Sequence, residues 1–136
     1  MAYFEWAADL VIDNGPIDVD HQHLVNMVNE LHTATSQGSG QEVVGQLLDQ
    51  LLSDTEQHIT REEQIMAALK FPRLDAHQRE HQKFVAELHA LQKKYAQGSL
   101  TTASQLSTLL RDWLSLHIRR SDREIRDFLT ARRAGR

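Results

Sequence analysis

The sequence predicts an all-α protein, an antiparallel up-down four-helix bundle that follows an irregular N-terminal arm. Apolar residues recur at steps of three and four along four long segments, as on the buried faces of amphipathic helices. Glycine or proline interrupts the chain between these segments, at Gly38, Gly40, Pro72 and Gly98. No segment shows the alternation of apolar and polar residues between turns that is typical of a strand.

The length of 136 residues fits a single domain. Within it we expect the arm at residues 1–17, the bundle at 18–130 and a short basic tail at 131–136. The arm contains Trp6 and Ile12, whose apolar side chains are expected to anchor it on the bundle.

The first helix is predicted to begin after Asp18, a residue type favoured at the N-cap, and to end near Ser36. Its apolar stripe consists of Leu24, Val28 and Leu31, with Val25 beside them. His21 lies on the same stripe, one turn before Leu24.

The second helix is predicted for residues 41–69 and the third from residues 71–73 to about residue 97. A histidine and a glutamate interrupt the apolar stripe of the second helix, which is Val44, Leu48, Leu51, Thr55, His58, Glu62, Ile65 and Leu69. Two histidines interrupt the stripe of the third, which is Leu74, His77, His81, Phe84, Leu88, Leu91 and Tyr95.

The fourth helix is predicted to begin at residues 101–102 and to continue through Ile125 and Phe128. Its stripe leads to His117 through Leu106, Leu109, Leu110, Trp113 and Leu114. All four predicted helices therefore carry polar side chains on the face that should be buried.

The composition excludes several classes of function. The net charge of -4 and the absence of a basic stripe argue against a nucleic-acid partner. With no cysteine, the chain has no disulfide, thiolate site or iron–sulfur ligand of its own. The apolar runs are shorter than the roughly 20 residues of a membrane-spanning helix, and residues 1–12 have no basic leader, so we expect a cytoplasmic protein.

The polar residues on the four stripes are typical of a metal site inside a bundle, because burying imidazoles and carboxylates without partners is costly. In an up-down bundle they fall at the same end: His21, His58, Glu62, His77, His81, His117 and Asp122. His32 lies about 16 Å along the helix axis from His21, and His89 about 12 Å from His81, so neither can reach the same centre. His23 points off its stripe.

The spacing agrees with this prediction except at one step. His58 with Glu62, and His77 with His81, are four residues apart, so each pair can chelate from one helix face. His117 and Asp122 are five positions apart, which is about 140° of rotation on an ideal helix. A local widening of the fourth helix, or a flexing of its last turns, is needed to aim both inward.

Imidazole and carboxylate ligands suit iron, zinc or manganese. Seven ligands exceed one octahedron, so we expect two ions bridged by the two carboxylates, with three imidazoles on one ion and two on the other. With one bridging solvent oxygen, the second ion keeps an open position for a small molecule such as O2.

These motifs resemble those of the hemerythrin family, specifically its single-domain bacterial members. The matching stretches, found between Trp6 and about Phe128, are residues 17–21 with Leu24, residues 58–63 with Met66, residues 77–81 with Phe84, and residues 113–118 with Asp122. The resemblance implies that His77, His81 and His117 hold one iron, that His21 and His58 hold the other, and that Glu62 and Asp122 bridge them. The five-residue step to Asp122 is the family's own spacing, and Glu63 is implied to be an outward neighbour.

The motifs also predict which residues wall the O2 site: Leu24, Ile59, Trp113, Leu114 and Ile118. Plain core packing explains the same residues equally well. Similar proteins commonly have Phe at the position of Ile59, and a smaller residue there could widen the pocket or open a path to solvent. They also often have Gln at Asp20 and Tyr at Gln57, and an N-cap is the favoured role for Asp18.

We therefore expect reversible O2 binding at a non-haem di-iron centre, for oxygen carriage, storage or sensing, rather than an enzyme. The alternatives are a di-iron enzyme acting on O2, peroxide or nitric oxide, an iron-storage protein and a structural zinc bundle. Five neutral imidazoles favour O2 release over the O–O cleavage of carboxylate-rich centres. The expected partners are O2 and an unidentified redox or signalling protein, and a monomer is favoured with an oligomer left open.

Overall fold

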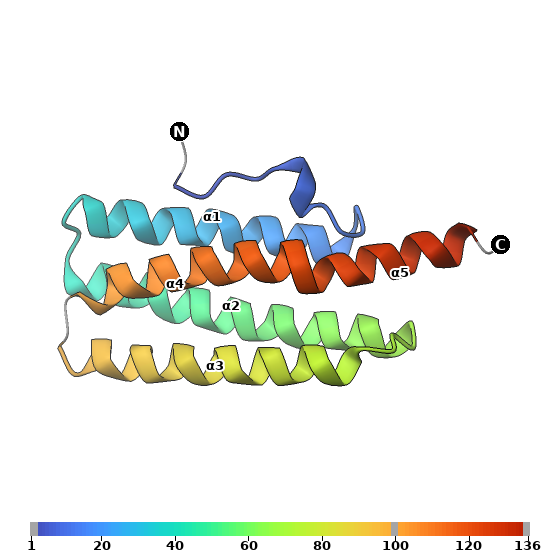
Figure 1. Cartoon of the computed structure of the whole chain (residues 1–136). Helices are drawn as coiled ribbons and strands as arrows, with labels where there is room; N and C mark the ends of the chain where they lie inside the picture. Colours follow the sequence, from blue (N-terminus) through green and yellow to red (C-terminus); the bar gives the residue numbers. More distant parts are fainter. Residues whose placement is uncertain (1–2, 99–100, 135–136) are drawn as a thin grey trace.

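The computed structural model describes residues 3–98 and 101–134 and confirms the predicted helical bundle (Figure 1). A short 3-10 helix in the arm precedes the bundle, whose elements are α1 (Pro16–Ser36), α2 (Gln41–Ala68), α3 (Leu74–Ala96), α4 (Thr102–His117), a π-helical segment (Ile118–Asp122) and α5 (Arg123–Ala134). Within the described residues there is no strand.

The helices run antiparallel to their neighbours in the sequence, and α4 packs against both α1 and α3, which closes the bundle (Figure 1). The π segment and α5 continue α4, and α5 extends beyond the connection between α2 and α3. None of the helices in the described part of the chain is both long enough and apolar enough to cross a membrane.

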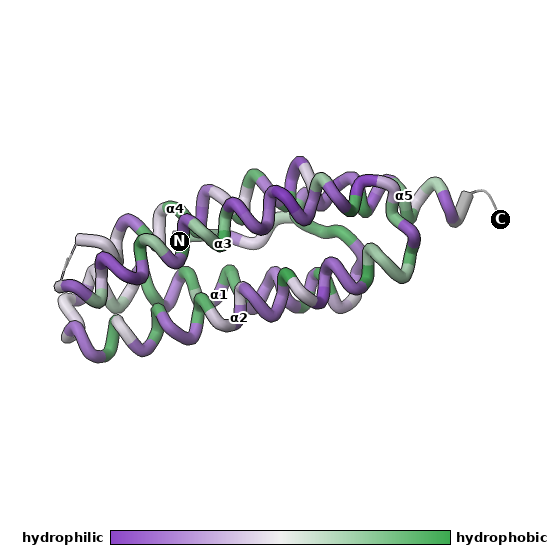
Figure 2. Tube along the Cα trace, turned by 90° about the horizontal axis from the view of Figure 1, so that it is seen from below, coloured by the Kyte–Doolittle hydropathy of each residue, from purple (hydrophilic) through white to green (hydrophobic). Residues whose placement is uncertain are grey.

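The core follows the predicted stripes. Hydrophobic and hydrophilic residues interchange along every helix (Figure 2), and the side chains of Leu31, Leu48, Leu51, Leu106 and Leu110 are fully buried. The end of α2 departs from its predicted stripe, because Met66 is buried where Ile65 is only partly covered. The predicted stripe repeats every 3.5 residues, whereas an α-helix has about 3.6 residues per turn, so the buried face passes to the next residue.

The start of α1 differs from the prediction. Asp18 is not the N-cap, because α1 begins at Pro16, and proline suits the first helical position. The carboxylate of Asp13 instead accepts hydrogen bonds from the backbone N–H groups of Gly15 (2.8 Å), Ile17 (3.1 Å) and Asp18 (3.2 Å). Asp18 turns back to the arm.

Asp18 thereby fixes the arm to the bundle. Its carboxylate accepts hydrogen bonds from the backbone N–H groups of Ile12 and Asn14, each at 2.8 Å. The predicted anchor Ile12 is buried and Trp6 is partly buried, while Leu10 in the 3-10 helix (Ala8–Leu10) is fully buried.

The connection between α2 and α3 also begins earlier than predicted. Lys70 takes a positive φ of 56°, and the N–H of Phe71 bonds to the carbonyl of Met66 at 2.9 Å, which ends α2 in a left-handed cap. Phe71 therefore belongs to the cap of α2, and α3 begins at Leu74. At the other end of the chain, residues 131–134 of the predicted tail belong to α5, and residues 135–136 lie outside the described part.

Candidate metal centre

The π-helical segment lies directly after His117 and ends at Asp122. A π turn contains more residues than an α turn, so residues five apart can face the same side. Both side chains are buried, with exposed fractions of 6% for His117 and 0% for Asp122. The widening that the five-residue step required is therefore present, and π segments of this kind are frequent at functional sites.

The structure brings all seven predicted residues together at one end of the bundle. His21 comes from α1, His58 and Glu62 from α2, and the other four from α3, α4 and the π segment. None of the seven is more than 6% exposed. Each helix contributes because its buried stripe carries a polar residue at the same depth.

Glu62 lies between two groups of histidines. Its Oε2 atom is 3.4 Å from Nε2 of His21 and 3.0 Å from Nε2 of His58. Its Oε1 atom is 3.5 Å from Nε2 of His81 and 3.8 Å from Nε2 of His117. Each oxygen of the Glu62 carboxylate therefore faces a different group of histidines.

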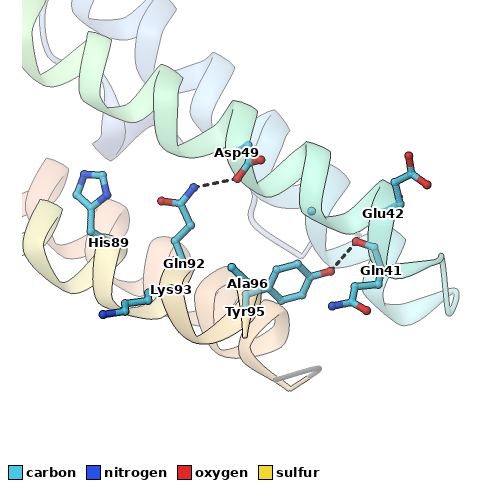
Figure 3. Close-up of a pocket in the computed structure, with 9 residues that line it drawn as sticks. Gln41, Glu42, Asp49, His89, Gln92, Lys93, Tyr95 and Ala96 are labelled. Carbon is cyan, nitrogen blue, oxygen red and sulfur yellow. Dashed lines mark hydrogen bonds between the residues drawn. The ribbon is translucent and has the colours of Figure 1, made fainter. Parts of the chain in front are cut away.

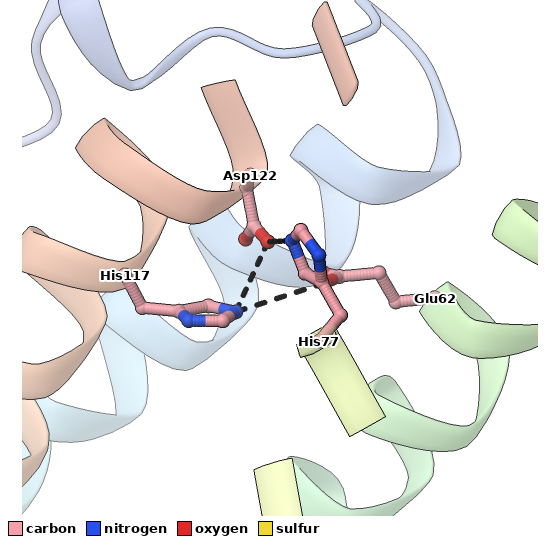
Figure 4. A group of neighbouring side chains, drawn as sticks. All are labelled: Glu62, His77, His117 and Asp122. Carbon is pink, nitrogen blue, oxygen red and sulfur yellow. Dashed lines mark ion pairs between the residues drawn. The ribbon is translucent and has the colours of Figure 1, made fainter. Parts of the chain in front are cut away.

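Asp122 divides its oxygens in the same way. Its Oδ2 atom lies 3.2 Å from Nε2 of His21, whereas Oδ1 lies 3.0 Å from Nε2 of His117 and 3.5 Å from Nε2 of His77 (Figure 4). Nε2 of His81 and Nε2 of His117 face each other at 3.1 Å. The two carboxylates therefore separate the histidines into a pair, His21 and His58, and a triplet, His77, His81 and His117.

The donor atoms of this cluster fit bound cations. In the described structure, both oxygens of Glu62, both oxygens of Asp122 and Nε2 of His21 and His77 are buried without a hydrogen-bond partner. They approach one another closely, but without hydrogen-bond geometry. Buried polar atoms of this kind are costly unless something compensates them, and a cation between nitrogen and oxygen donors does so.

The pKa values of the buried groups also favour a cation at this cluster. Burial lowers the pKa of the His21 imidazole, but the carboxylates of Asp122 and Glu62 outweigh burial and raise it to about 9. The same two carboxylates overcome burial at His117 and raise its pKa to about 10. Burial opposes ionisation of Glu62, yet the histidines hold its pKa well below its usual range. The two carboxylates thus create a site that favours positive charge.

Three further carboxylates contact the outer nitrogens of the histidines. Nδ1 of His58 lies 3.3 Å from Asp20, Nδ1 of His81 lies 3.3 Å from Glu63, and Nδ1 of His117 lies 3.3 Å from Glu80. An acceptor on Nδ1 orients an imidazole and leaves Nε2 to bind a metal.

These outer carboxylates were not predicted as a set. Glu63 was expected only to point outward, and Glu80 was not singled out. A signal was present, since each of the three lies within three residues of a predicted ligand, at a position next to the buried stripe. Sequence periodicity alone does not show which of many such acidic residues reaches a ring.

The predicted walls of the O2 site lie in two environments. Leu24, Leu114 and Ile118 are buried core residues at 1% exposure or less. Trp113 is partly exposed and stacks on His117, with ring centroids 4.2 Å apart and planes 11° apart. Ile59 lines a surface cavity of about 340 Å³ together with His81. Two of the five residues thus border the triplet rather than the pair.

The three histidines excluded by depth or by direction lie outside the cluster. His23 and His89 are more than half exposed and pair with Asp54 and Glu56, while His32 stacks on Tyr3. The largest of the surface pockets described, about 730 Å³, lies near His89 and Tyr95, towards the other end of α2 and α3 (Figure 3). This pocket contains none of the seven residues.

Comparisons with known proteins show the family of the chain. The family model of the hemerythrin HHE cation binding domain matches residues 15–129. A bacteriohemerythrin of Stenotrophomonas maltophilia is 30% identical over 131 residues, which cover 96% of this chain and 84% of the relative. A bacteriohemerythrin of Methylococcus capsulatus is 33% identical over 124 residues, covering 90% of this chain and 94% of the relative.

Solved structures give the same result. A crystal structure of a hemerythrin mutant superposes with a TM-score of 0.81 at 28% sequence identity, covering 93% of this chain and 97% of that chain. Its fold is therefore shared over nearly the whole length. Together with the family model and the two relatives, this shows that the chain belongs to the hemerythrin family of metal-binding helical bundles.

Proposed function

We propose that this protein binds O2 reversibly at a non-haem di-iron centre, for oxygen carriage, storage or sensing. The observation that carries the proposal is the unequal division of the histidines by the two carboxylates. Glu62 and Asp122 each direct one oxygen to the triplet and the other to the pair. Two ions in such a site have different numbers of protein ligands.

In this proposal His77, His81 and His117 hold one iron, His21 and His58 hold the other, and Glu62 and Asp122 bridge the two. When bound, the two irons would supply the electrons for O2, and the pair offers fewer histidine ligands than the triplet, which would leave room for O2 on its side of the cluster. The names of the relatives, bacteriohemerythrin, support iron over zinc or manganese as the resident metal.

The ligand set favours O2 binding over oxidation of a substrate. Five neutral imidazoles place less negative charge on the ions than a carboxylate-rich set would, so high-valent iron is less stabilised and bound O2 can be released. Leu24, Leu114 and Ile118 are buried apolar residues close to the ligands in the sequence, and we expect them to help exclude water from the centre. Water exclusion protects a reduced centre from irreversible oxidation.

The oligomeric state, the location in the cell and the partners of the protein are also part of the proposal. We propose a monomer whose ligand is O2, in the cytoplasm, acting alone or with a redox or signalling protein. The net charge of -4 agrees with the proposal that no nucleic acid binds.

Iron loading followed by O2 titration tests this function. The purified chain is loaded with ferrous iron without oxygen, analysed for metal, and titrated with O2 while its visible absorption is recorded. We expect two irons per chain and an absorption band that appears with O2 and disappears under vacuum. A variant with the exposed His89 replaced, His89→Gln, serves as the control and should behave like the parent chain.

Other outcomes contradict the proposal in distinct ways. Zinc as the tightly held metal, or no metal, excludes a di-iron centre. Iron that enters in large excess indicates storage. Consumption of O2 or peroxide through many turnovers, without a reversible band, indicates an enzyme.

A further inference from the structure

The Asp20 carboxylate differs from the other two outer carboxylates. Its Oδ2 atom accepts a hydrogen bond from Nδ1 of His58 at 3.3 Å. The same carboxylate accepts two hydrogen bonds from Arg61, from Nε to Oδ2 and from Nη2 to Oδ1, both at 2.8 Å. Asp20 thus joins a histidine of the pair to a guanidinium group through a two-point contact.

The corresponding contacts on the triplet have another character. Glu80, whose carboxylate lies 3.3 Å from Nδ1 of His117, accepts a hydrogen bond from the neutral hydroxyl of Ser121 at 2.7 Å. Among the described residues, Asp20 is the one outer carboxylate that forms an ion pair with arginine or lysine. The cationic partner is therefore specific to the side of the cluster that holds two histidines.

The contacts of Asp20 and Arg61 affect the electron density on Nε2 of His58. A carboxylate that accepts the Nδ1 proton of an imidazole pushes electron density towards Nε2 and makes it a stronger metal ligand. A guanidinium bound to the same carboxylate withdraws part of that density, because bidentate charge-assisted hydrogen bonds polarise the oxygens towards the cation. Asp20 and Arg61 thus act on Nε2 of His58 in opposite senses.

The position of the contacts suits such a role. The Asp20 side chain is 19% exposed and that of His58 only 4%, so the hydrogen bond between them lies largely outside bulk water. Arg61 is about half exposed, at 48%, and lies one residue before Glu62 on α2. Its own salt bridge adds little stability at that exposure, which makes a purely structural role a weak explanation for the bidentate geometry.

We propose that Asp20 and Arg61 are opposed positioning residues that set the donor strength of His58. This inference rests on the proposed function, in which the iron that His21 and His58 would hold is the one that would take O2. Asp20 strengthens the hold of His58 on that iron and favours its oxidised state. Arg61 limits this effect and keeps the reduced state accessible, as reversible O2 binding requires.

Two substitutions separate this role from a structural one. Asp20→Asn removes the negative charge, and Arg61→Gln removes the positive charge while Asp20 stays. The measurements are the rate at which ferrous iron passes to a chelator and the midpoint potential of the iron centre without O2. We expect Asp20→Asn to speed iron release about 10-fold and raise the potential, and Arg61→Gln to slow release and lower the potential.

Opposite shifts in the two variants distinguish the proposed role from a structural one. If the ion pair only holds α1 against α2, both variants loosen the site, and both release iron faster. The same direction of change in both variants, or no change in either, overturns the proposal. Arg73→Gln, which breaks the exposed ion pair with Glu124, is the matched control and should leave both measurements unchanged.

A third variant covers the case in which Asp20→Asn does not fold. Arg61→Lys keeps the charge without the planar fork, so its potential should lie between those of the parent chain and Arg61→Gln. A potential for Arg61→Lys outside that interval contradicts the proposal. Failure of the parent chain to bind iron defeats the proposed function, whereas iron binding without opposite shifts defeats this inference alone.

Discussion

The two ends of the bundle are built from the same helices but have different cores. The apolar half comprises residues 25–36, 41–55, 84–96 and 102–110, and it is filled by aliphatic and aromatic side chains. Its buried hydroxyls at Thr55 and Ser107 donate to backbone carbonyls of their own segments. The metal half comprises residues 16–24, 58–68, 74–81 and 114–125, and its centre consists of imidazoles and carboxylates.

The apolar half therefore contributes mainly to the stability of the fold, and the metal half carries the candidate site. Burial of apolar surface stabilises the apolar half without any ligand. The metal half buries polar atoms that lack hydrogen-bond partners in the described structure, so we expect its stability to depend on a bound cation. The two halves should therefore respond differently to the same perturbation.

Metal removal should have the largest effect. We expect the metal-free chain to lose more than about 4 kcal/mol of stability, as for a ligand at a thousandfold excess over its dissociation constant. Hydrogen exchange should rise mainly in residues 16–24, 58–68, 74–81 and 114–125. Exchange followed by mass spectrometry, with and without iron, resolves the two halves, and an equal rise in both would contradict the separation.

Glu62→Gln should have the next largest effect, confined to the metal half. The amide keeps the size of the side chain but removes the charge that faces both histidine groups. We expect iron content, measured by elemental analysis, to fall to a small fraction of that of the parent chain. Full iron content in this variant would show that Glu62 is not a ligand.

Leu48→Ala is the counterpart in the apolar half. Leu48 is fully buried, so its truncation should cost about 2–5 kcal/mol of unfolding free energy, measured by denaturant titration of the iron-loaded chain. Iron content should be unchanged. Loss of iron in this variant would mean that the two halves are coupled more strongly than their cores suggest.

Ile59→Phe should have the smallest effect, on rate rather than on stability. Ile59 and Val85 line the 340 Å³ cavity that reaches His81, and a larger side chain should fill it and limit solvent access. We expect autoxidation of the O2-bound protein, followed by the decay of its absorption band, to slow several-fold. Val85→Phe fills the same cavity from α3 and should act alike, whereas an unchanged or faster rate in both would show that Ile59 is plain core packing.

Much of the fold could be predicted, because periodic apolar residues indicate the buried face of each helix. The candidate site followed from the same periodicity, since His58 and Glu62 on one stripe and His77 and His81 on another must face the core. The five-residue step between His117 and Asp122 indicated a local widening or a flexing of the fourth helix, because an ideal α-helix cannot aim both inward, and the π segment provides the widening.

The contacts that could not be predicted are those in which a side chain of one segment reaches another segment. Asp13 and Asp18 are equally good capping residues by type, and the choice between them depends on where Pro16 starts the helix. The contact of Asp20 with His58 joins α1 to α2, and that of Glu80 with His117 joins α3 to α4. Such contacts depend on helix separation and rotamers, which single-sequence periodicity does not contain.

A crystal structure of the iron-loaded chain, with anomalous diffraction measured at the iron absorption edge, tests the central claim most directly. We predict two anomalous peaks between Glu62 and Asp122, one beside Nε2 of His77, His81 and His117, and one beside Nε2 of His21 and His58. A single peak, or two peaks with equal numbers of histidine ligands, would contradict the account.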